Sequence, residues 1–186
     1  MAAPGNIAID DLTGWWSMLP VPNNPKMVGS SLQNLQLSES YDSILKVQGV
    51  NWLTRKVLNV GNITMTIKQY ADKAGFTHLT IDSKSGSGVP GSIENRLLNN
   101  ETRHASHPLF GKITGCTARV NLADLPSAWL ADGWEQGTTR AIIITTEHLD
   151  IDRLNGEYRY IRHIEVRKGG ETLKAKLVYD YLGPLE

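Results

Sequence analysis

The residues best suited to chemistry lie on a long predicted strand near the end of the chain, EYRYIRHIEVRK (157–168). Side chains alternate along a strand, so Tyr158, Tyr160 and Arg162 share one face. A guanidinium among aromatic rings can bind a ligand carboxylate or polarise a carbonyl by hydrogen bonding. It can equally pair with a protein carboxylate such as Glu147, or stack on an aromatic ring. Both roles of Arg162 remain open at the level of sequence.

The last predicted strand, ETLKAKLVYDYL (171–182), supplies a facing surface. Leu177 and Tyr179 share one face, whereas Lys176 and Asp180 take the other. A tyrosine can donate a hydrogen bond to a carbonyl while its ring forms an apolar wall. The face predicted to point inward carries Tyr160, Arg162, Leu177 and Tyr179. The face predicted to meet solvent on the penultimate strand carries Arg159, Ile161, His163, Glu165 and Arg167.

A histidine in a turn adds a candidate acid–base group. His107 precedes Pro108, and an imidazole titrates near neutral pH, so we place His107 at the rim of a pocket. His104 lies three residues earlier and would point to the opposite face of a regular strand, so the two are not expected to share a metal. The sequence contains no motif of serine hydrolases, phosphate-binding loops, zinc proteases or dinucleotide-binding folds. We therefore expect neither a metal nor a cofactor.

The chain that positions these groups has 186 residues, of which 40% are hydrophobic and 20% charged. This composition predicts one packed domain over 1–186, with a flexible N-terminus over 1–10. Nineteen basic residues balance 19 acidic ones, so the chain lacks the positive excess typical of nucleic-acid binding. We see no secretory signal and no apolar run of about 20 residues for a membrane span. With Cys116 as its single cysteine, the chain is predicted to be cytoplasmic.

After residue 61 the hydrophobic pattern takes a period of two, which is typical of strands. ITMTIKQY (63–70), for example, places Met65 and Ile67 on one face. Gly169–Gly170 and Asn155–Gly156 are two-residue hairpin signals. About nine such strands with short links predict a mainly β fold, an antiparallel up-and-down barrel of eight to ten strands. A barrel of this size can hold one small ligand.

Two predicted helices interrupt this pattern over residues 38–60. Ser38, or the serine two residues later, can cap the first helix, and Asn51 can cap the second. The second helix carries Trp52 and Leu53, which we expect to contact a ligand. A helix pair between the first strand and the rest is well placed to cover the open end of the barrel. It can act there as a mobile lid or as a fixed plug, since a helix with one apolar face fits both.

Four segments carry a resemblance to a known family: VQGVNWLTRKVL, ITMTIKQY, FGKITG and YRYIRHIEVRKGGETLKAKLVYDYLG. Together they resemble small fungal intracellular proteins with a lipocalin-like, or calycin, barrel, many of which are labelled after an unrelated cysteine-rich domain. The resemblance covers residues 10–184. It implies a role in fungal specialised metabolism, where such barrels bind, and sometimes cyclise, polyketide or terpenoid intermediates. The proline-rich loop over 20–37 departs from the family pattern and would lie near the mouth.

Gly14 and Trp16 also match the G-x-W signature that lipocalins carry on their first strand. In that family the tryptophan closes the base of the barrel against a basic side chain from a late strand. Arg167 or Lys174 is expected in this role here.

These observations predict an enzyme that binds an apolar small molecule and cyclises or isomerises it without a cofactor. The candidate catalytic residues are Arg162, Tyr160 and His107. The candidate ligand-binding residues are Tyr158, Tyr179, Leu177, Met65, Ile67, Trp52 and Leu53. A non-catalytic carrier of a lipid or metabolite is the alternative. A haem-binding barrel of the nitrobindin type would need His78 or His104 to point inward.

Overall fold

The computed structural model describes residues 3–4, 7–18, 37–86, 88–132, 134, 139–144, 147–154 and 157–185. Of residues 60, 147–154, 157 and 158 it describes the backbone alone. The strands are β1 (Gly14–Met18), β2 (Ile63–Ala71), β3 (Thr77–Ser85), β4 (Ser92–Leu97), β5 (Arg103–His107), β6 (Gly111–Gly115), β7 (Thr117–Asn121), β8 (Arg140–Ile144), β9 (Glu147–Leu154), β10 (Glu157–Lys168) and β11 (Glu171–Gly183). The helices are α1 (Asp42–Val47), α2 (Trp52–Val60), the 3₁₀ turn η1 (Leu122–Asp124) and α3 (Ala128–Ala131).

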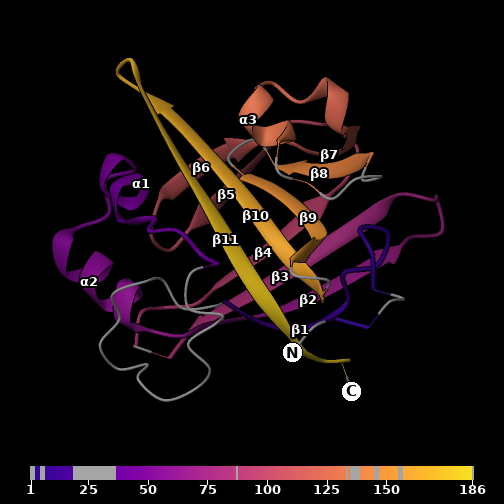
Figure 1. Cartoon of the computed structure of the whole chain (residues 1–186), viewed down its shortest axis with the longest axis horizontal. Coiled ribbons are helices and arrows are strands. Elements are labelled where there is room, and N and C mark those ends of the chain that lie inside the picture. The colour runs from indigo at the N-terminus through magenta and orange to yellow at the C-terminus, as the bar shows by residue number, and fades with distance from the viewer. Residues whose placement is uncertain are drawn as a thin grey trace.

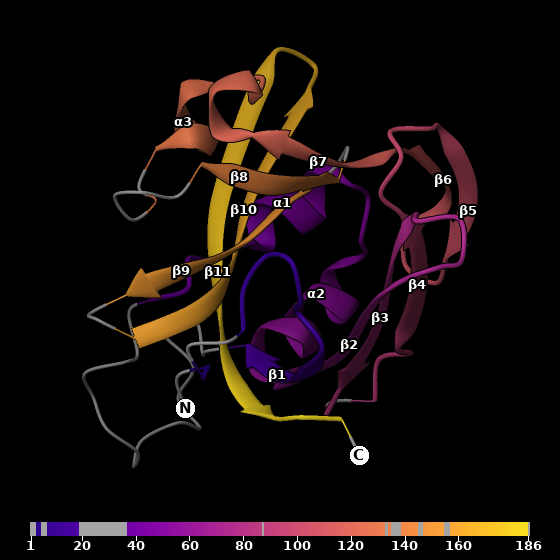
Figure 2. The same cartoon turned by 90° about the vertical axis from the view of Figure 1, so that its right-hand side faces the viewer.

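Nine strands form one antiparallel sheet in the order β4-β3-β2-β1-β11-β10-β9-β8-β7 (Figure 1). Most neighbours in this order are also neighbours in sequence, and β1 joins the two halves by pairing with β11. The sheet curls into a half-barrel, and β5 and β6 form a separate hairpin beside β4 (Figure 2). The predicted mainly β, antiparallel, calycin-like fold is confirmed.

The β10–β11 hairpin is the longest element and follows the predicted register. Gly169 and Gly170 form its turn with φ of +59° and +85°, a backbone conformation that favours glycine. Tyr160 pairs with Tyr179 and Arg162 with Leu177, so these side chains share the inner face. The second predicted turn, at residues 155 and 156, lies outside the described residues. So does the proline-rich loop predicted over 20–37, except for its last residue.

Trp16 packs in the core where β1 pairs with β11. The indole is fully buried, and its Nε1 donates a hydrogen bond to the carbonyl oxygen of Leu12 at 3.0 Å. Its ring packs on Tyr160 and Tyr181, with centroids 5.4 and 5.0 Å away. A Cβ on Gly14 would lie 2.4 Å from Cε2 of Tyr181, which explains why glycine precedes this tryptophan by two positions. The first strand therefore needs both residues of the G-x-W motif.

The basic partner predicted for Trp16 is wrong. Arg167 and Lys174 lie beside the β10–β11 turn and form ion pairs with Glu165. Trp16 lies at the opposite end of β11, opposite Tyr181. Hydrogen bonding to Leu12 and packing on tyrosines fill the place of the cation.

The prediction that the outer face of β10 meets solvent is wrong for three of its residues. Arg159, Ile161 and His163 are buried. The η1–α3 segment folds over this face, and the rings of Trp129 and Trp134 pack at a tilt on the His163 ring, at 4.9 and 4.3 Å between centroids. Strand alternation separates the two faces of β10 but does not say what covers each one.

An ion pair and a helix cap complete this outer layer. Nε of Arg159 lies 2.9 Å from Oδ1 of Asp180 on β11. Ser127 caps α3, since its Oγ accepts a hydrogen bond from the backbone N–H of Leu130 at 3.4 Å. Asp124 is the last residue of the preceding 3₁₀ turn η1.

The helix pair packs between β11 and β2–β4 (Figures 1 and 2). Asn51 caps α2 as predicted: its Oδ1 accepts the backbone N–H of Thr54 at 2.9 Å. Tyr41, rather than a serine, occupies the cap position of α1. The Ser38 hydroxyl instead bonds the backbone of Val178, accepting from its N–H at 3.0 Å and donating to its C=O at 3.3 Å. This contact extends the pairing of β11 beyond the end of β1.

The N-terminal segment packs against the core in part. In the N-terminal segment predicted to be flexible, Ala3 and Ile7 are buried against the core. No helix among the described residues is long and apolar enough to cross a membrane.

Candidate active site

A cavity of about 380 Å³ lies inside the half-barrel, under α1 and α2. Its apolar wall comprises Met18, Ile44, Leu45, Leu58, Ile63, Met65, Val89, Leu109, Phe110, Ile113, Ile164 and Leu177. Its ionisable or amide-bearing lining comprises Tyr41, Gln48, Lys84, Glu94, Arg96, His107, Arg162 and Tyr179. Such a site favours an apolar ligand that carries a few hydrogen-bonding atoms.

Arg162 lines this cavity from β10 and is 8% exposed. Its Nη1 lies 3.8 Å from Sδ of Met65 on β2, a contact between a guanidinium and a weak sulfur acceptor. The side chain of Glu147, the internal partner considered from the sequence, is outside the described residues. The guanidinium is thus held at the cavity wall, where it contacts a side chain from the other half of the sheet.

A second guanidinium enters from β4, where the sequence analysis named no candidate. Nε of Arg96 lies 3.0 Å from Oε2 of Glu94, and its Nη2 also contacts that oxygen. Both side chains are partly buried, at 16% and 18% exposure. Residues two apart on a strand share a face. The spacing of Glu94 and Arg96 was therefore the sequence signal that could have identified this ion pair.

Glu94 remains ionised between these cations. Burial alone would raise the pKa of its carboxyl group, but the charges of Arg96 and Arg162 outweigh that effect and hold the pKa below its usual value. Glu94 thus lies electrostatically between one arginine from β4 and one from β10.

His107 lines the cavity from the end of β5. Its Nδ1 accepts a hydrogen bond from the backbone N–H of Leu109 at 3.1 Å, and its ring stacks on Phe110 with centroids 4.6 Å apart. Accepting at Nδ1 places the proton of the neutral ring on Nε2, which can then donate. Burial lowers the pKa of His107, and Arg96 lowers it further against the opposing charge of Glu94. The neutral tautomer is thereby favoured.

The structure brings five predicted site residues together on the cavity wall: Arg162, His107, Leu177, Met65 and Tyr179. Tyr160 and Ile67 are fully buried but do not line the cavity. The Tyr160 ring packs between Trp16 and Tyr179, and its hydroxyl has no hydrogen-bond partner among the described residues. The side chain of Tyr158 lies outside the described residues.

Trp52 and Leu53 were predicted to contact a ligand, but they do not line the cavity. They are 63% and 64% exposed, and α2 presents Leu58 to the cavity instead. Contacts with α1 set this orientation, since Arg55 and Asn59 bond the carboxylate of Asp42 at 3.2 and 3.0 Å. The helix itself was predicted correctly. Which of its faces meets the cavity depends on these polar contacts, which the sequence pattern does not reveal.

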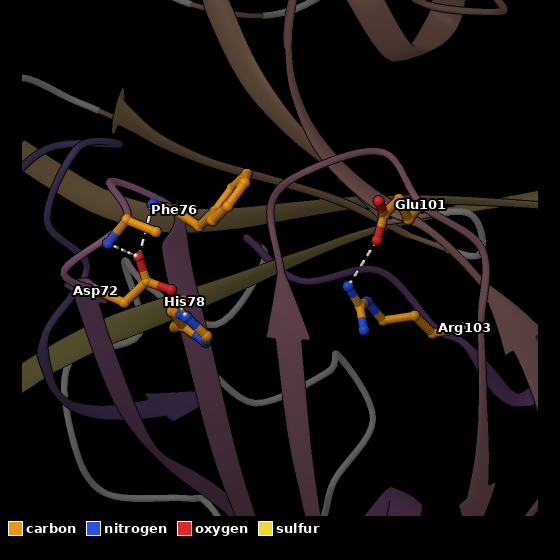
Figure 3. Close-up of polar contacts among 6 residues, drawn as sticks. Asp72, Phe76, His78, Glu101 and Arg103 are labelled. Atoms are coloured by element: carbon orange, nitrogen blue, oxygen red, sulfur yellow. Dashed lines mark hydrogen bonds and ion pairs between the residues drawn. The ribbon is translucent and has the colours of Figure 1, made fainter.

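The two histidines that a haem-binding barrel would need lie outside this cavity. His78 Nε2 is 2.9 Å from Oδ2 of Asp72, in a turn that Asp72 braces by accepting the Phe76 backbone N–H (Figure 3). His104 Nδ1 is 2.9 Å from the Thr114 hydroxyl. Among the described residues, no group of three or more histidine, cysteine or acidic side chains could hold a metal ion.

No family model matches the chain. Solved structures support the fold. A point mutant of the REP1-NXSQ fatty acid transporter superposes with a TM-score of 0.54 at 13% identity, covering 92% of this chain and 98% of its own. Zebrafish ileal bile acid-binding protein, complexed with cholic acid, gives 0.51 at 9% identity with the same coverage.

Two curated relatives match nearly the whole chain. The probable pericyclase scpY of Mollisia scopiformis is 31% identical over an alignment of 196 positions that covers 98% of this chain and 96% of the relative. The pericyclase pydY of Acremonium sp. is 31% identical over an alignment of 197 positions that covers 99% of this chain and 98% of the relative. The chain belongs to the family of these fungal pericyclases.

Proposed function

We propose that the protein is a cofactor-independent pericyclase, which binds a polyketide- or terpenoid-like intermediate and cyclises or isomerises it. The observation that carries this proposal is the cavity itself, an apolar chamber with Arg162, His107 and Tyr179 on its wall. Membership of a family named for pericyclic chemistry supports it.

A pericyclic step suits these groups because it rearranges electrons within one molecule. In a Diels–Alder reaction, a diene and an alkene exchange three π bonds for two σ bonds and one new π bond. No atom enters or leaves, no proton is transferred, and no nucleophile is needed. The wall has only to hold the two reacting ends in contact, which can lower the barrier by several kcal/mol.

Hydrogen bonding would supply the electronic contribution. A carbonyl conjugated to the alkene becomes more electron-poor when Arg162 donates to it, and the alkene then reacts faster with the diene. His107 Nε2–H and the Tyr179 hydroxyl are further donors on the same wall. Tyr160 serves as a positioning residue, because its ring packs on Tyr179 with centroids 5.1 Å apart.

A non-catalytic carrier of a lipid or hydrophobic metabolite is the second candidate. It is favoured by the shared fold with proteins described as a fatty acid transporter and a bile acid-binding protein. In that case Arg162 would grip a carboxylate and the ligand would leave unchanged. The two functions differ in whether the released molecule is an isomer of the one bound.

Variants of Arg162 and Tyr160 test the enzyme role. Arg162→Met should lower the rate of conversion by about a hundredfold, since it removes a donor aimed at developing charge. Tyr160→Phe is the matched control: it removes a hydroxyl that bonds no described residue and should leave the rate within about threefold. Single-turnover assays by liquid chromatography measure both. An unchanged rate in Arg162→Met would refute the assigned role.

A further inference from the structure

A second cavity of about 220 Å³ lies next to the first, along β4. Both faces of β4 contribute to its lining, Ile93 and Asn95 as well as Glu94 and Arg96, so the cavity follows the edge of the strand. The β5–β6 hairpin and β7 supply the opposite side. It shares part of its lining with the main cavity. The residues that line both are Glu94, Arg96, His107 and Ile113.

This space exists because the sheet does not close with a ladder between its two ends. Among the described residues, no ladder joins β4 to β7, and one isolated bridge links Leu98, just after β4, to Thr117 on β7. Asn100 N–H donates to the Thr117 carbonyl at 3.0 Å, and Nη1 of Arg96 lies 3.5 Å from the Thr117 hydroxyl. An edge strand without a ladder presents a row of backbone N–H and C=O groups, which are uncharged donors and acceptors.

The charged side chains of the second cavity cancel in pairs. Arg96 contacts Glu94, and Nη2 of Arg103 lies 2.9 Å from Oε2 of Glu101 (Figure 3). The hydroxyl groups that also line the cavity are those of Ser106, Thr114 and Thr117. Two cations and two anions leave no net charge to attract an ion, whereas hydroxyls and edge backbone groups bond a neutral polar group in both directions.

We propose that the second cavity binds the uncharged polar head of an amphipathic substrate, with its apolar body in the main cavity. This inference rests on the proposed function and narrows its substrate class: the head donates and accepts hydrogen bonds, as a primary amide or an alcohol does. Glu94 and Arg96, which line both cavities, then lie beside the junction of head and body.

Dodecyl probes that differ only in the head group test this assignment. Dodecanamide, dodecanol, dodecanoate and dodecylammonium are titrated into the purified protein at neutral pH by isothermal calorimetry. The two neutral probes should bind about three- to tenfold more tightly than the two ions, the value of one or two net hydrogen bonds. Tighter binding of the carboxylate would overturn the proposal.

A substitution that fills the second cavity alone tests the location. Ala105 is exposed and lines only this cavity, and Lys112 is exposed on the same hairpin and lines neither. Ala105→Trp should abolish the preference for dodecanamide over dodecanoate, and Lys112→Trp should keep it, with circular dichroism confirming that both fold.

The outcomes separate this inference from the proposed function. If Ala105→Trp keeps the preference, or only slows association without changing it, the second cavity is not a head-group site, and the proposed function stands. If the wild-type protein binds no dodecyl probe, the ligand-holding cavity fails and both proposals fail with it.

Discussion

At the scale of single residues, the Glu94 carboxylate determines how two cations share one wall. It contacts Arg96 directly and attracts Arg162, so its charge offsets repulsion between the two guanidinium groups. Because all three groups are largely shielded from water, removal of the shared carboxylate should cost more stability than the loss of a surface ion pair. The wall can therefore present Arg162 to a ligand at little cost in stability.

Replacing this carboxylate tests that account. Glu94→Gln should lower the free energy of unfolding by about 2 kcal/mol, since it leaves two partly buried cations without their shared anion. Glu101→Gln is the matched control, because Glu101 also pairs with an arginine two residues away but is 68% exposed. It should cost less than about 0.5 kcal/mol. Urea unfolding measures both, and equal losses would contradict the account.

His107 predicts a pH dependence of stability. Its pKa in the folded protein lies below the usual value, so the unfolded chain binds the proton first as pH falls. Stability contributed by the neutral ring is complete above the ordinary pKa of about 6.5 and is lost as pH falls from there through the lowered pKa. Protonation also removes the lone pair that accepts the Leu109 N–H.

Urea unfolding at pH 7.5 and 5.5 measures this effect, a range that stays above the titration of Glu94. The wild-type protein should lose more stability between these values than His107→Gln does. The variant keeps a polar side chain but cannot titrate. An equal loss in the two proteins would show that His107 does not titrate differently on folding.

At the scale of elements, the η1–α3 segment makes the β10–β11 hairpin a buried layer rather than an outer wall. Trp129 packs on His163 and lies under the ammonium of Lys174, which is 5.3 Å from its ring centroid. These contacts lie on the face of β10 opposite to Arg162. The segment should therefore support the cavity without touching a ligand.

Trp129→Ala separates support from binding. It should lower the free energy of unfolding by about 2 kcal/mol, less than for a fully buried tryptophan because this side chain is only half-buried. Dodecanol affinity should stay within about twofold of the wild type. Leu177→Ala is the contrasting variant, because Leu177 lines the cavity and its loss should weaken binding as well. A large loss of affinity in Trp129→Ala would contradict the division.

The sequence predicted the inner face of the hairpin because alternation alone determines it. Arg162, Leu177 and Tyr179 followed from that rule. The rotation of α2 did not, since contacts with Asp42 turn Trp52 outward. Likewise, the burial of His163 depends on a distant segment that folds over it, which no local pattern specifies.

At the scale of the whole molecule, the fold is a curled sheet whose first and last strands, β1 and β11, pair at its centre. Its two edge strands, β4 and β7, stay nearly unpaired with each other among the described residues. Trp16 is fully buried at the central β1–β11 pairing. The gap between β4 and β7 is lined by Glu94 and Arg96, polar residues of the short strand β4 that were not predicted as site residues. The centre of the sheet thus gives stability, while the gap between its two edge strands carries polar groups that can bind a ligand.

The central claim is that the bound molecule is converted to an isomer, and one measurement tests it most directly. The gene is deleted in the organism that produces the protein, the metabolite that accumulates is purified, and it is incubated with the wild-type protein. The account predicts a product of identical mass with one more ring, formed far faster than without protein and about a hundredfold more slowly with Arg162→Met. Recovery of the metabolite bound but unchanged would contradict it and identify a carrier.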